Sequence, residues 1–524
     1  MLPRTAESPC HNCRRQRRRC DRSLPHCAKC ASRGIQCLGY SQLLLWTGAT
    51  ASRGRQAGDI SISSMLRDLS TQPAGIELPS KPQDTAVNTE GMSGSVCQDA
   101  PVNQQVSLVH PRHAVYTTSA PRTLIDPLFQ DLEPSYRCYL HYFSSRVCLD
   151  LVAHDTPERN PFRNLIPLAH AHPLLREVIV ATSAAHMCNQ ARALNAANRF
   201  GQIEVPGHRE MDALVAKQKA LHMMPAALES IETVGCDVIL AAALFLVNIE
   251  LIESGKHGWR PHLEGTRKIM SLLRPLIAVD ETWRDYVLSD CIVYHILNSA
   301  FAPSTPDLQT EHRSLDPMSI LRKATNSYFC CPPEVLEVVH LASQMSRTTG
   351  NDDTVEDGLL STGLDLLHRA QSVDVLAWAL KAREIPDLAS SAIGSRYRAG
   401  SAHRLAACLY IMQAAPSLQR SVGDEVVDVI MDDLQHTLEA IPPSDSNFKS
   451  TTWPTFIFGA TAKSDERKTW VIDRLRRLAV AYPWRYLNTS METLEILWSL
   501  EAEGKLKQGW LPTLRDPEHN ILVV

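Results

Sequence analysis

Six cysteines near the N-terminus form the pattern in this sequence that is best able to do chemistry. Their spacing, C-x2-C-x6-C-x6-C-x2-C-x6-C, is two copies of one C-x2-C-x6-C unit joined by a loop. A C-x2-C step places two thiolates on one turn of chain, where both can bind the same ion. No apolar secretory segment follows the start, so clustered cysteines favour metal ligands over disulfides. The expected ligands are Cys10, Cys13, Cys20, Cys27, Cys30 and Cys37.

The number of ligands predicts two zinc ions. Each zinc prefers four tetrahedral ligands, so two separate sites need more sulfurs than the six cysteines provide. Two sulfurs must then bridge both ions, and the repeat favours the leading cysteine of each half, Cys10 and Cys27. A single zinc with two spare cysteines is the alternative. Residues 1–40 contain too little aliphatic side chain for a core, so we expect metal to supply their folding free energy.

The segment around the cysteines is basic, unlike the rest of the chain. Residues 1–56 hold 11 Lys and Arg but 2 Asp and Glu, whereas the whole chain holds 53 basic and 57 acidic residues. A small basic head on a mildly acidic body predicts a polyanion as the partner of the head. The thiolates exceed the charge of two Zn²⁺, and the nearby side chains that can balance them are Arg14, Arg15, Arg17, Arg18, Arg19 and Lys29.

Together these residues resemble the binuclear zinc cluster of fungal transcription factors. The resemblance rests on the cysteine spacing, the basic run CRRQRRRC, Asp21 after the third cysteine and Pro25 two residues before the fourth. It implies two short helices around a zinc pair, with the first and fourth cysteines as bridging ligands. It also implies that the first helix presents its end to the DNA major groove and reads a CGG-type triplet. A zinc module that binds protein or lipid is the competing interpretation.

The resemblance assigns DNA contacts to the basic run. The main base-reading position is Arg17, whose guanidinium can bond to O6 and N7 of guanine. The position before it, often Lys in relatives, is Gln16 here. Positions that usually hold phosphates are Arg14, Arg19 and Arg22, and such contacts set register rather than sequence preference. The run can also serve as a nuclear import signal. The expected DNA-binding set is Arg14, Gln16, Arg17, Arg18, Arg19 and Arg22.

The chain after the cysteine cluster divides into segments of different character. Residues 41–56 form a short extension, and residues 57–130 are expected to be mostly disordered linker, with a short helix over Ile60–Leu69. From about Asp131, apolar residues recur at helical spacing without strand alternation, which predicts a large all-α domain over 131–510 and a tail over 511–524. The expected helices are 133–152, 171–190, 207–229, 232–253, 260–275, 281–299, 333–347, 355–371, 373–383, 397–415, 422–440, 464–482 and 489–503, with breaks such as Pro442–Pro454.

The body resembles the fungal-specific regulatory domain of acriflavine-sensitivity control proteins. The resemblance rests on segments that occur in the right order: Gly39–Gly54, Asn160–Ala169, Ala181–His186, Ile249–Gly265, and Trp453–Gly459 followed by Leu494 and Trp498. Trp259, His262 and Gly265 share a helical face, so a core histidine beside a tryptophan is expected there. His186 is expected in the core, and Glu250 is either paired or faces a pocket.

The sequence holds no motif typical of an enzyme. H-E-x-x-H, G-x-x-x-x-G-K-[ST], G-x-G-x-x-G and G-x-S-x-G are absent, so no catalytic residues are expected. The cysteines beyond the cluster are expected to be buried apolar residues, and the adjacent Cys330 and Cys331 have no helix start or basic neighbour in sequence to activate them. A solvated acidic face is expected from Glu425, Asp428, Asp432, Asp433 and Glu439.

These features predict a nuclear, sequence-specific DNA-binding regulator of RNA polymerase II transcription. Its expected partners are double-stranded DNA and transcription co-regulators, and a homodimer through the body is left open. No membrane association is expected, because the longest apolar run, Val238–Val247, is too short to cross a bilayer. The alternative function is a metabolite-sensing regulator whose helical body binds a small molecule and acts with partner factors.

Overall fold

The chain divides into two units, Met1–Ala114 and Val115–Val524. The computed structural model describes residues 9–10, 13, 16, 18–24, 26–34, 37 and 129–524, apart from 157, 198–206, 257, 274–281, 303–315, 348–352, 386–387, 389 and 507–508. The expected linker through residue 128 and the expected helix Ile60–Leu69 therefore lie outside the described residues.

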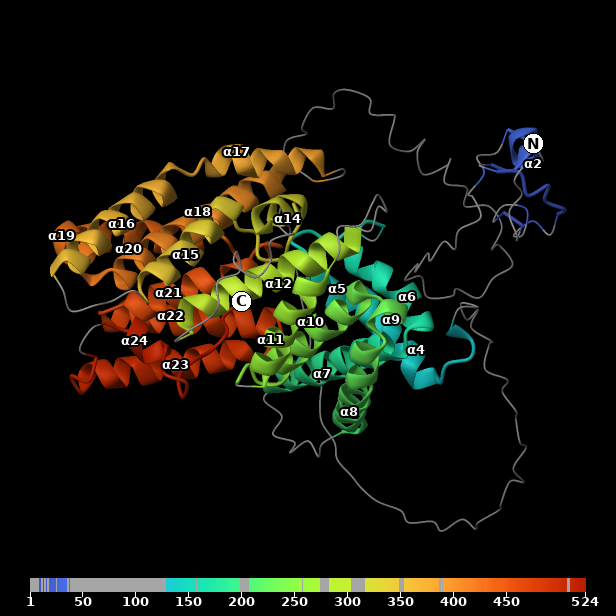
Figure 1. Cartoon of the computed structure of the whole chain (residues 1–524), viewed down its shortest axis with the longest axis horizontal. Coiled ribbons are helices and arrows are strands. Elements are labelled where there is room, and N and C mark those ends of the chain that lie inside the picture. Colours follow the sequence, from blue (N-terminus) through green and yellow to red (C-terminus); the bar gives the residue numbers. More distant parts are fainter. Residues whose placement is uncertain are drawn as a thin grey trace, which may run out of the picture. The chain divides into compact units, whose positions relative to one another are not determined.

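The described part of the second unit is all-α, as the periodicity predicts. No strand forms within it, and Val152 and Ser327 make an isolated antiparallel bridge. Figure 1 shows the helices, which are α4 (Pro134–Tyr142), η2 (Phe143–Val147), α5 (Cys148–Asp150), η3 (Pro161–Asn164), α6 (Leu165–Ala171), α7 (Pro173–Ala197), α8 (His208–Glu229), α9 (Ile231–Val234), α10 (Cys236–Glu253), α11 (Trp259–Leu272), α12 (Thr282–Phe301), α14 (Pro317–Lys323), α15 (Pro333–Met345), α16 (Asp353–Ser372), α17 (Val375–Leu380), η4 (Lys381–Glu384), α18 (Ser390–Ala414), α19 (Pro416–Val422), α20 (Asp424–Glu439), η5 (Lys449–Thr451), α21 (Thr452–Thr461), α22 (Asp465–Ala481), α23 (Tyr486–Ala502) and α24 (Leu511–Leu514).

Several helices begin where a polar side chain caps their first backbone amides. Asn160 accepts a hydrogen bond from the N–H of Phe162 before η3, and Asp374 accepts one from Ala377 before α17. Asp316 does the same for α14 and Ser464 for α22. These residues satisfy N–H groups that have no partner inside the helix, which fixes where each helix starts.

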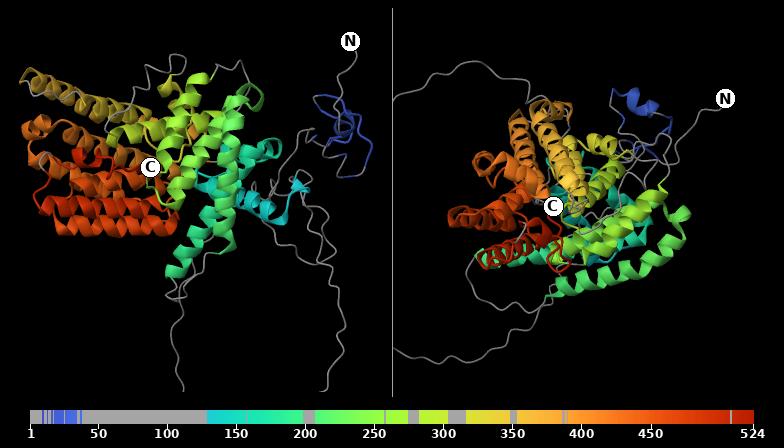
Figure 2. Two further views of the ribbon diagram at one scale, coloured as in Figure 1. Left: turned by 60° about the horizontal axis from the view of Figure 1, so that its bottom comes forward. Right: turned by 60° about the vertical axis from the view of Figure 1, so that its left-hand side comes forward.

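Helix α10 is the centre of the first half of the domain. Every side chain from Val238 to Ile249 is buried, so the helix must be covered on all sides. Helices α7, α8, α11 and α12 pack against it, as Figures 1 and 2 show. No helix among the described residues is both long and apolar enough to cross a bilayer.

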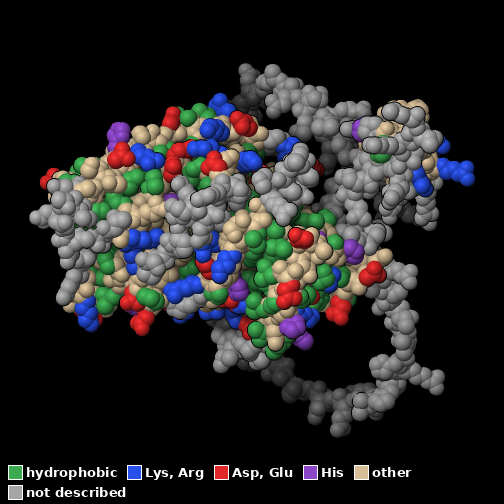
Figure 3. Space-filling model, in the orientation of Figure 1, with side chains coloured by type: hydrophobic (Ala, Val, Ile, Leu, Met, Phe, Trp, Pro, Cys, Tyr) green, Lys and Arg blue, Asp and Glu red, His purple; other side chains and the backbone are tan. Residues whose placement is uncertain are grey.

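Helix α18 has the same central place in the second half. Helices α15, α16, α17, α20 and α21 pack against it, and α12 contacts α10 on one side and α14 and α15 on the other. Because α12 joins both halves, their buried side chains form one continuous hydrophobic core. The face in Figure 3 carries acidic and basic side chains interspersed, which is unlike the single-sign surface of a nucleic-acid-binding domain.

Several segments differ from the sequence prediction, and α6 and α14 form where no helix was expected. The expected break Pro442–Pro454 contains the start of α21, because Pro454 lies in the first helical turn, where a missing N–H costs nothing. Residues 511–524, assigned to a tail from sequence, hold the short helix α24 and bury their side chains from Ile521 to Val524 in the core. The apolar run ILVV is the signal in the sequence for this burial.

A network of buried polar groups joins the start of the domain to its end. Asp150 accepts hydrogen bonds from Nε1 of Trp484 at 2.9 Å, and its carboxylate lies 3.0 Å from Nε2 of His186. Burial acts to raise the pKa of Asp150, but the hydrogen bond and charge of His186 and the charge of Lys449 lower it below its usual value. Burial lowers the pKa of Lys449 to about 8. His186 and Lys449 thus stabilise the ionised form of the Asp150 carboxylate inside this network.

Candidate metal centre and nucleic-acid interface

The two halves of the cysteine cluster are built alike. The backbone N–H of Cys10 donates to Sγ of Cys20 at 3.3 Å, and that of Cys27 donates to Sγ of Cys37 at 3.4 Å. Both bonds span ten residues, so each C-x2-C-x6-C unit folds its third cysteine back onto its first. After Cys27 the chain forms the single-turn helix α2 (Ala28–Ala31). Most of the corresponding turn after Cys10 lies outside the described residues.

The sulfur atoms have the spacing that tetrahedral zinc requires. The Sγ atoms of Cys10, Cys13, Cys27 and Cys30 all lie within 4.8 Å of one another, and all four residues are buried. Individual Sγ–Sγ distances are 3.7 Å for Cys10–Cys30, 3.8 Å for Cys13–Cys27 and 3.5 Å for Cys20–Cys27. Two sulfurs at zinc–sulfur bond length on one tetrahedral ion lie about 3.8 Å apart. None of the six cysteines forms a disulfide, so the donor set fits zinc.

Without metal, burial opposes thiolate formation in this cluster. Burial raises the pKa of Cys10 well above its usual value and raises that of Cys27 to about 12. Burial acts the same way on Cys20, but the backbone N–H groups of Cys10 and Arg22 lower its pKa to about 7. A bound cation stabilises the thiolate forms together, and this makes folding of the segment depend on metal.

Arg33 is a residue of this centre that the sequence analysis missed. Its Nη2 donates to Sγ of Cys13 at 3.6 Å and of Cys30 at 4.0 Å, and its Nε donates to the carbonyl of Lys29 at 2.8 Å. Its Nη1 donates to Oε1 of Gln16 at 2.8 Å. Arg33 thus offsets thiolate charge and ties the second half of the cluster to the basic run of the first. Its place one helical turn after Cys30 is the signal that could have found it.

The basic run is only partly described. Arg14 and Arg17, the expected phosphate and guanine contacts, lie outside the described residues, whereas Gln16, Arg18, Arg19 and Arg22 are placed and exposed. The N–H of Arg18 donates to the carbonyl of Cys13 at 2.8 Å, and the N–H of Arg22 donates to Sγ of Cys20 at 3.4 Å. Arg22 adopts a left-handed conformation with φ of 59°. Arg18 and Arg22 are therefore each tied through the backbone to a zinc ligand, while the four described side chains face solvent.

In the helical domain, two of the three residues expected in the core, His186 and Trp259, lie there. His186 is buried and contacts the hydroxyl of Tyr142 through Nδ1 at 3.0 Å. Trp259 is buried and its Nε1 has no hydrogen-bond partner among the described residues, so the expected hydrogen bond with His262, which is only partly buried, does not form. Nε2 of His262 lies 4.0 Å from Oε1 of Glu250, which pairs with Lys217 at 2.7 Å. Of the two readings for Glu250, the paired one is correct.

Trp498 and Leu494, in the last segments of the sequence resemblance, both lie against Gly459. Nε1 of Trp498 donates to the carbonyl of Gly459 at 3.0 Å, so α23 bonds directly to α21. A Cβ added at Gly459 would lie 2.8 Å from side-chain carbons of Leu494 and Val471. Gly459 therefore lets α21 pack closely against α22 and α23, and any larger residue would force these side chains to move.

The adjacent cysteines are inert for a different reason from the one expected. The sequence around Cys330 and Cys331 shows no basic neighbour, but the fold brings Arg396 near Cys330, and Cys331 lies two residues before the start of α15. Burial nevertheless raises the pKa of Cys330 to about 11 and that of Cys331 well above its usual value. Both thiols are therefore protonated at neutral pH.

Comparison with known proteins identifies both units. Residues 8–47 match the family described as the fungal Zn(2)-Cys(6) binuclear cluster domain, and residues 138–524 match the fungal specific transcription factor domain. The chain belongs to the fungal-specific transcription factors. As in other members with this cluster, its six cysteines bind two zinc ions, and the protein is a DNA-binding regulator of transcription.

A protein of Neurospora crassa is similar to this chain along nearly its whole length. The acriflavine sensitivity control protein acr-2 of that organism is 29% identical over 594 residues, which cover 98% of this chain and 96% of the relative. The resemblance stated from the sequence is therefore confirmed along nearly the whole chain. No solved structure matches the chain.

Proposed function

We propose that this regulator acts in the nucleus on RNA polymerase II genes and reads CGG-type triplets through the basic run of its zinc cluster. The observation that carries the proposal is the attachment of exposed arginines to the metal ligands. Arg18 and Arg22 are bonded through their backbones to Cys13 and Cys20. These bonds hold the backbone of Arg18 and Arg22 against the zinc ligands, which supports insertion of this part of the chain into a DNA groove.

Within this element the side chains have separate roles. Arg17 donates to O6 and N7 of guanine, whereas Arg14, Arg19 and Arg22 contact phosphates and set the register. Arg18 adds to the positive field. Gln16 already accepts a hydrogen bond from Arg33 at 2.8 Å, which supports a positioning role beside Arg17. Cys10 and Cys27 are the proposed bridging ligands, since each starts one of the two matching halves.

The helical domain is proposed as the regulatory part and not as an enzyme. Its acidic face supports contact with co-regulators, because Asp428 and Asp432 are 64% and 72% exposed. Both carboxylates also pair with Arg467. Such contacts, or association of two helical domains, would link the DNA-bound cluster to the transcription machinery. We propose four functional segments: the zinc cluster over 1–40, its extension over 41–56, a linker over 57–130 and the regulatory domain over 131–510.

Arg19→Gln tests the phosphate contacts. The variant is expected to weaken binding to all DNA sequences to the same degree and to lower the slope of log affinity against log salt by about 1, because one counterion fewer is released. Titrations of labelled duplexes with full-length protein at several salt concentrations measure both quantities. Lys463→Gln, on a helical-domain residue that is 69% exposed, is the matched control and should keep the slope. An unchanged slope for Arg19→Gln would exclude this phosphate contact.

A further inference from the structure

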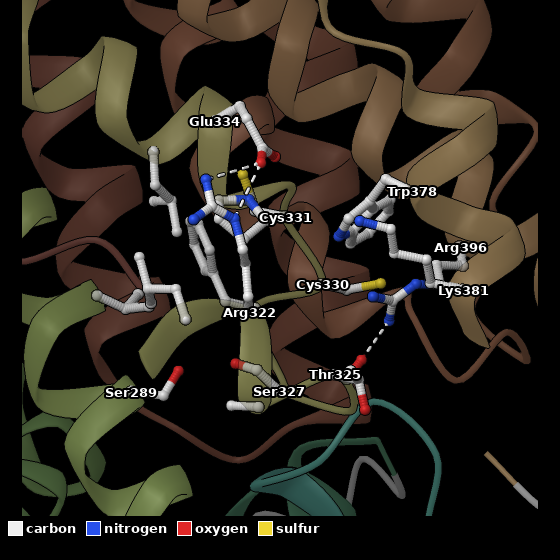
Figure 4. Close-up of a pocket in the computed structure, with 16 residues that line it drawn as sticks. Ser289, Arg322, Thr325, Ser327, Cys330, Cys331, Glu334, Trp378, Lys381 and Arg396 are labelled. Atoms are coloured by element: carbon white, nitrogen blue, oxygen red, sulfur yellow. Dashed lines mark hydrogen bonds and ion pairs between the residues drawn. The ribbon is translucent and has the colours of Figure 1, made fainter. Parts of the chain in front are cut away.

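The helical domain contains a pocket far in sequence from the zinc cluster. It lies where α12, α14, α15, α17 and α18 meet, has a cavity volume of about 50 Å³ and is partly open to solvent (Figure 4). Its walls are largely apolar, formed by Val293, Leu321, Phe329, Leu336 and Trp378. Ligand sites have this character when a few polar groups also converge on the cavity.

One of those polar groups is an arginine buried without a counter-ion. Arg396 is 4% exposed, and its guanidinium carbon stacks 3.8 Å from the ring centre of Trp378. Its Nη1 donates to the carbonyl of Thr325 at 2.6 Å, as the dashed line in Figure 4 shows. Its Nε is buried without a hydrogen-bond partner, and no carboxylate among the described residues forms an ion pair with it. Burying such a charge is costly unless an anion pairs with it.

The remaining polar groups of the pocket also favour an anion. Three of its lining residues are basic, Arg322, Lys381 and Arg396, and one is acidic, Glu334. Glu334 lies 3.3 Å from Arg322, and both are well exposed, so this pair does not neutralise Arg396. Burial lowers the pKa of Arg396, which reports the cost of holding its charge.

Two further features mark the same cavity. The hydroxyls of Ser289 and Ser327 line the pocket and are buried without hydrogen-bond partners in the described part of the chain. Buried polar atoms are usually satisfied, so each such atom points to a missing partner. Cys330 adopts a left-handed conformation with φ of 48°, an unusual backbone state that concentrates at ligand sites.

We propose that this pocket binds a small organic carboxylate with an apolar or aromatic body. The free N–H groups of Arg396 donate to the carboxylate, as planar guanidinium groups do best. The unpaired serine hydroxyls complete its hydrogen bonds, Lys381 adds positive charge at the rim, and the apolar walls cover the rest of the molecule. This inference goes beyond the DNA-reading function and does not depend on it. It gives the helical domain a chemical basis for sensing a metabolite.

Binding of phenylacetate to full-length, zinc-loaded protein tests the proposal. Titration calorimetry should show one site per chain, and the melting temperature of the helical domain should rise with phenylacetate concentration. Phenylacetamide, which has the same shape without the charge, should bind at least about tenfold more weakly, because a charge-assisted hydrogen bond is lost. Hexanoate extends the test to an aliphatic body, and sodium chloride at equal concentration controls for ionic strength.

Variants assign the binding to the pocket. Arg396→Gln should weaken phenylacetate binding at least about tenfold, Lys381→Gln should weaken it less, and Lys463→Gln should bind like the wild type. If Arg396→Gln does not fold, the test rests on two other results. These are weaker phenylacetate binding by Lys381→Gln, a variant of an exposed residue, and weaker binding of phenylacetamide than of phenylacetate. Equal binding of acid and amide, or no heat and no melting shift with either carboxylate at millimolar concentration, would overturn the proposal. DNA binding is measured separately, so failure here leaves the proposed DNA reading intact.

Discussion

Removing zinc is expected to abolish DNA binding by this protein while leaving the melting of its helical domain unchanged. The cluster residues cannot build a hydrophobic core, and their sulfurs are spaced for metal, so the zinc supplies the folding free energy of the head, on the order of 10 kcal/mol or more. The helical domain has its own continuous core. A chelator titration, followed by DNA binding and by thermal unfolding in parallel, measures both effects, and added zinc should restore binding.

Cysteine variants make the same test without a chelator. Cys27→Ser should lower the zinc content measured by elemental analysis and abolish DNA binding, because Cys27 lies in contact distance of the sulfurs of Cys13 and Cys20. Cys138→Ser is the matched control, since Cys138 is an exposed thiol of the helical domain and should keep two zinc ions and full binding. DNA binding that survives complete loss of zinc would refute the role given to the cluster.

Asp150→Asn is expected to destabilise the helical domain by about 3 kcal/mol or more. The carboxylate is 14% exposed and serves His186, Trp484 and the charge of Lys449 together, so its loss leaves buried groups without their partner. Denaturant unfolding of full-length protein near pH 7 measures the change. Because the pKa of Asp150 is lower in the folded state, its contribution is complete at that pH and is lost only as the pH falls through the folded pKa.

The matched control is the same substitution on the surface. Asp428 is 64% exposed and pairs with Arg467 at 2.8 Å, so Asp428→Asn should cost less than about 1 kcal/mol. If Asp150→Asn unfolds at the wild-type denaturant concentration, the buried network does not stabilise the fold as described. The paired measurement separates the effect of burial from that of losing one negative charge.

The zinc centre could be predicted from sequence because metal ligation is local chemistry. A thiolate only has to reach its ion, so the spacing from Cys10 to Cys37 identified the centre. The contact between Arg33 and Cys13 was missed because it spans 20 residues and exists only once the two halves fold together. The periodicity likewise predicted the long helices, whereas the start of α21 was missed because Pro454 reads as a break until its position in the first turn is known.

The sequence could not predict which side chains of neighbouring helices contact each other. Spacing placed His262 on the same face as Trp259, but the packing of α11 against α10 puts Glu250 beside the histidine. The pocket around Arg396 draws residues from Ser289 to Arg396, on helices whose relative placement no local pattern encodes. Periodicity shows which residues are buried, and only the fold shows which buried residues meet.

A randomised-DNA selection tests the proposed reading of CGG-type triplets through Arg17. Purified full-length protein, loaded with zinc, is selected at about 150 mM salt, near physiological ionic strength, alongside Arg17→Ala and the control Lys463→Gln. We predict enrichment of CGG-containing sites with the wild type and the control, lost with Arg17→Ala, and the number and spacing of triplets will report monomer or dimer. Absence of enrichment from zinc-loaded wild-type protein, or equal enrichment by Arg17→Ala, would contradict this proposal.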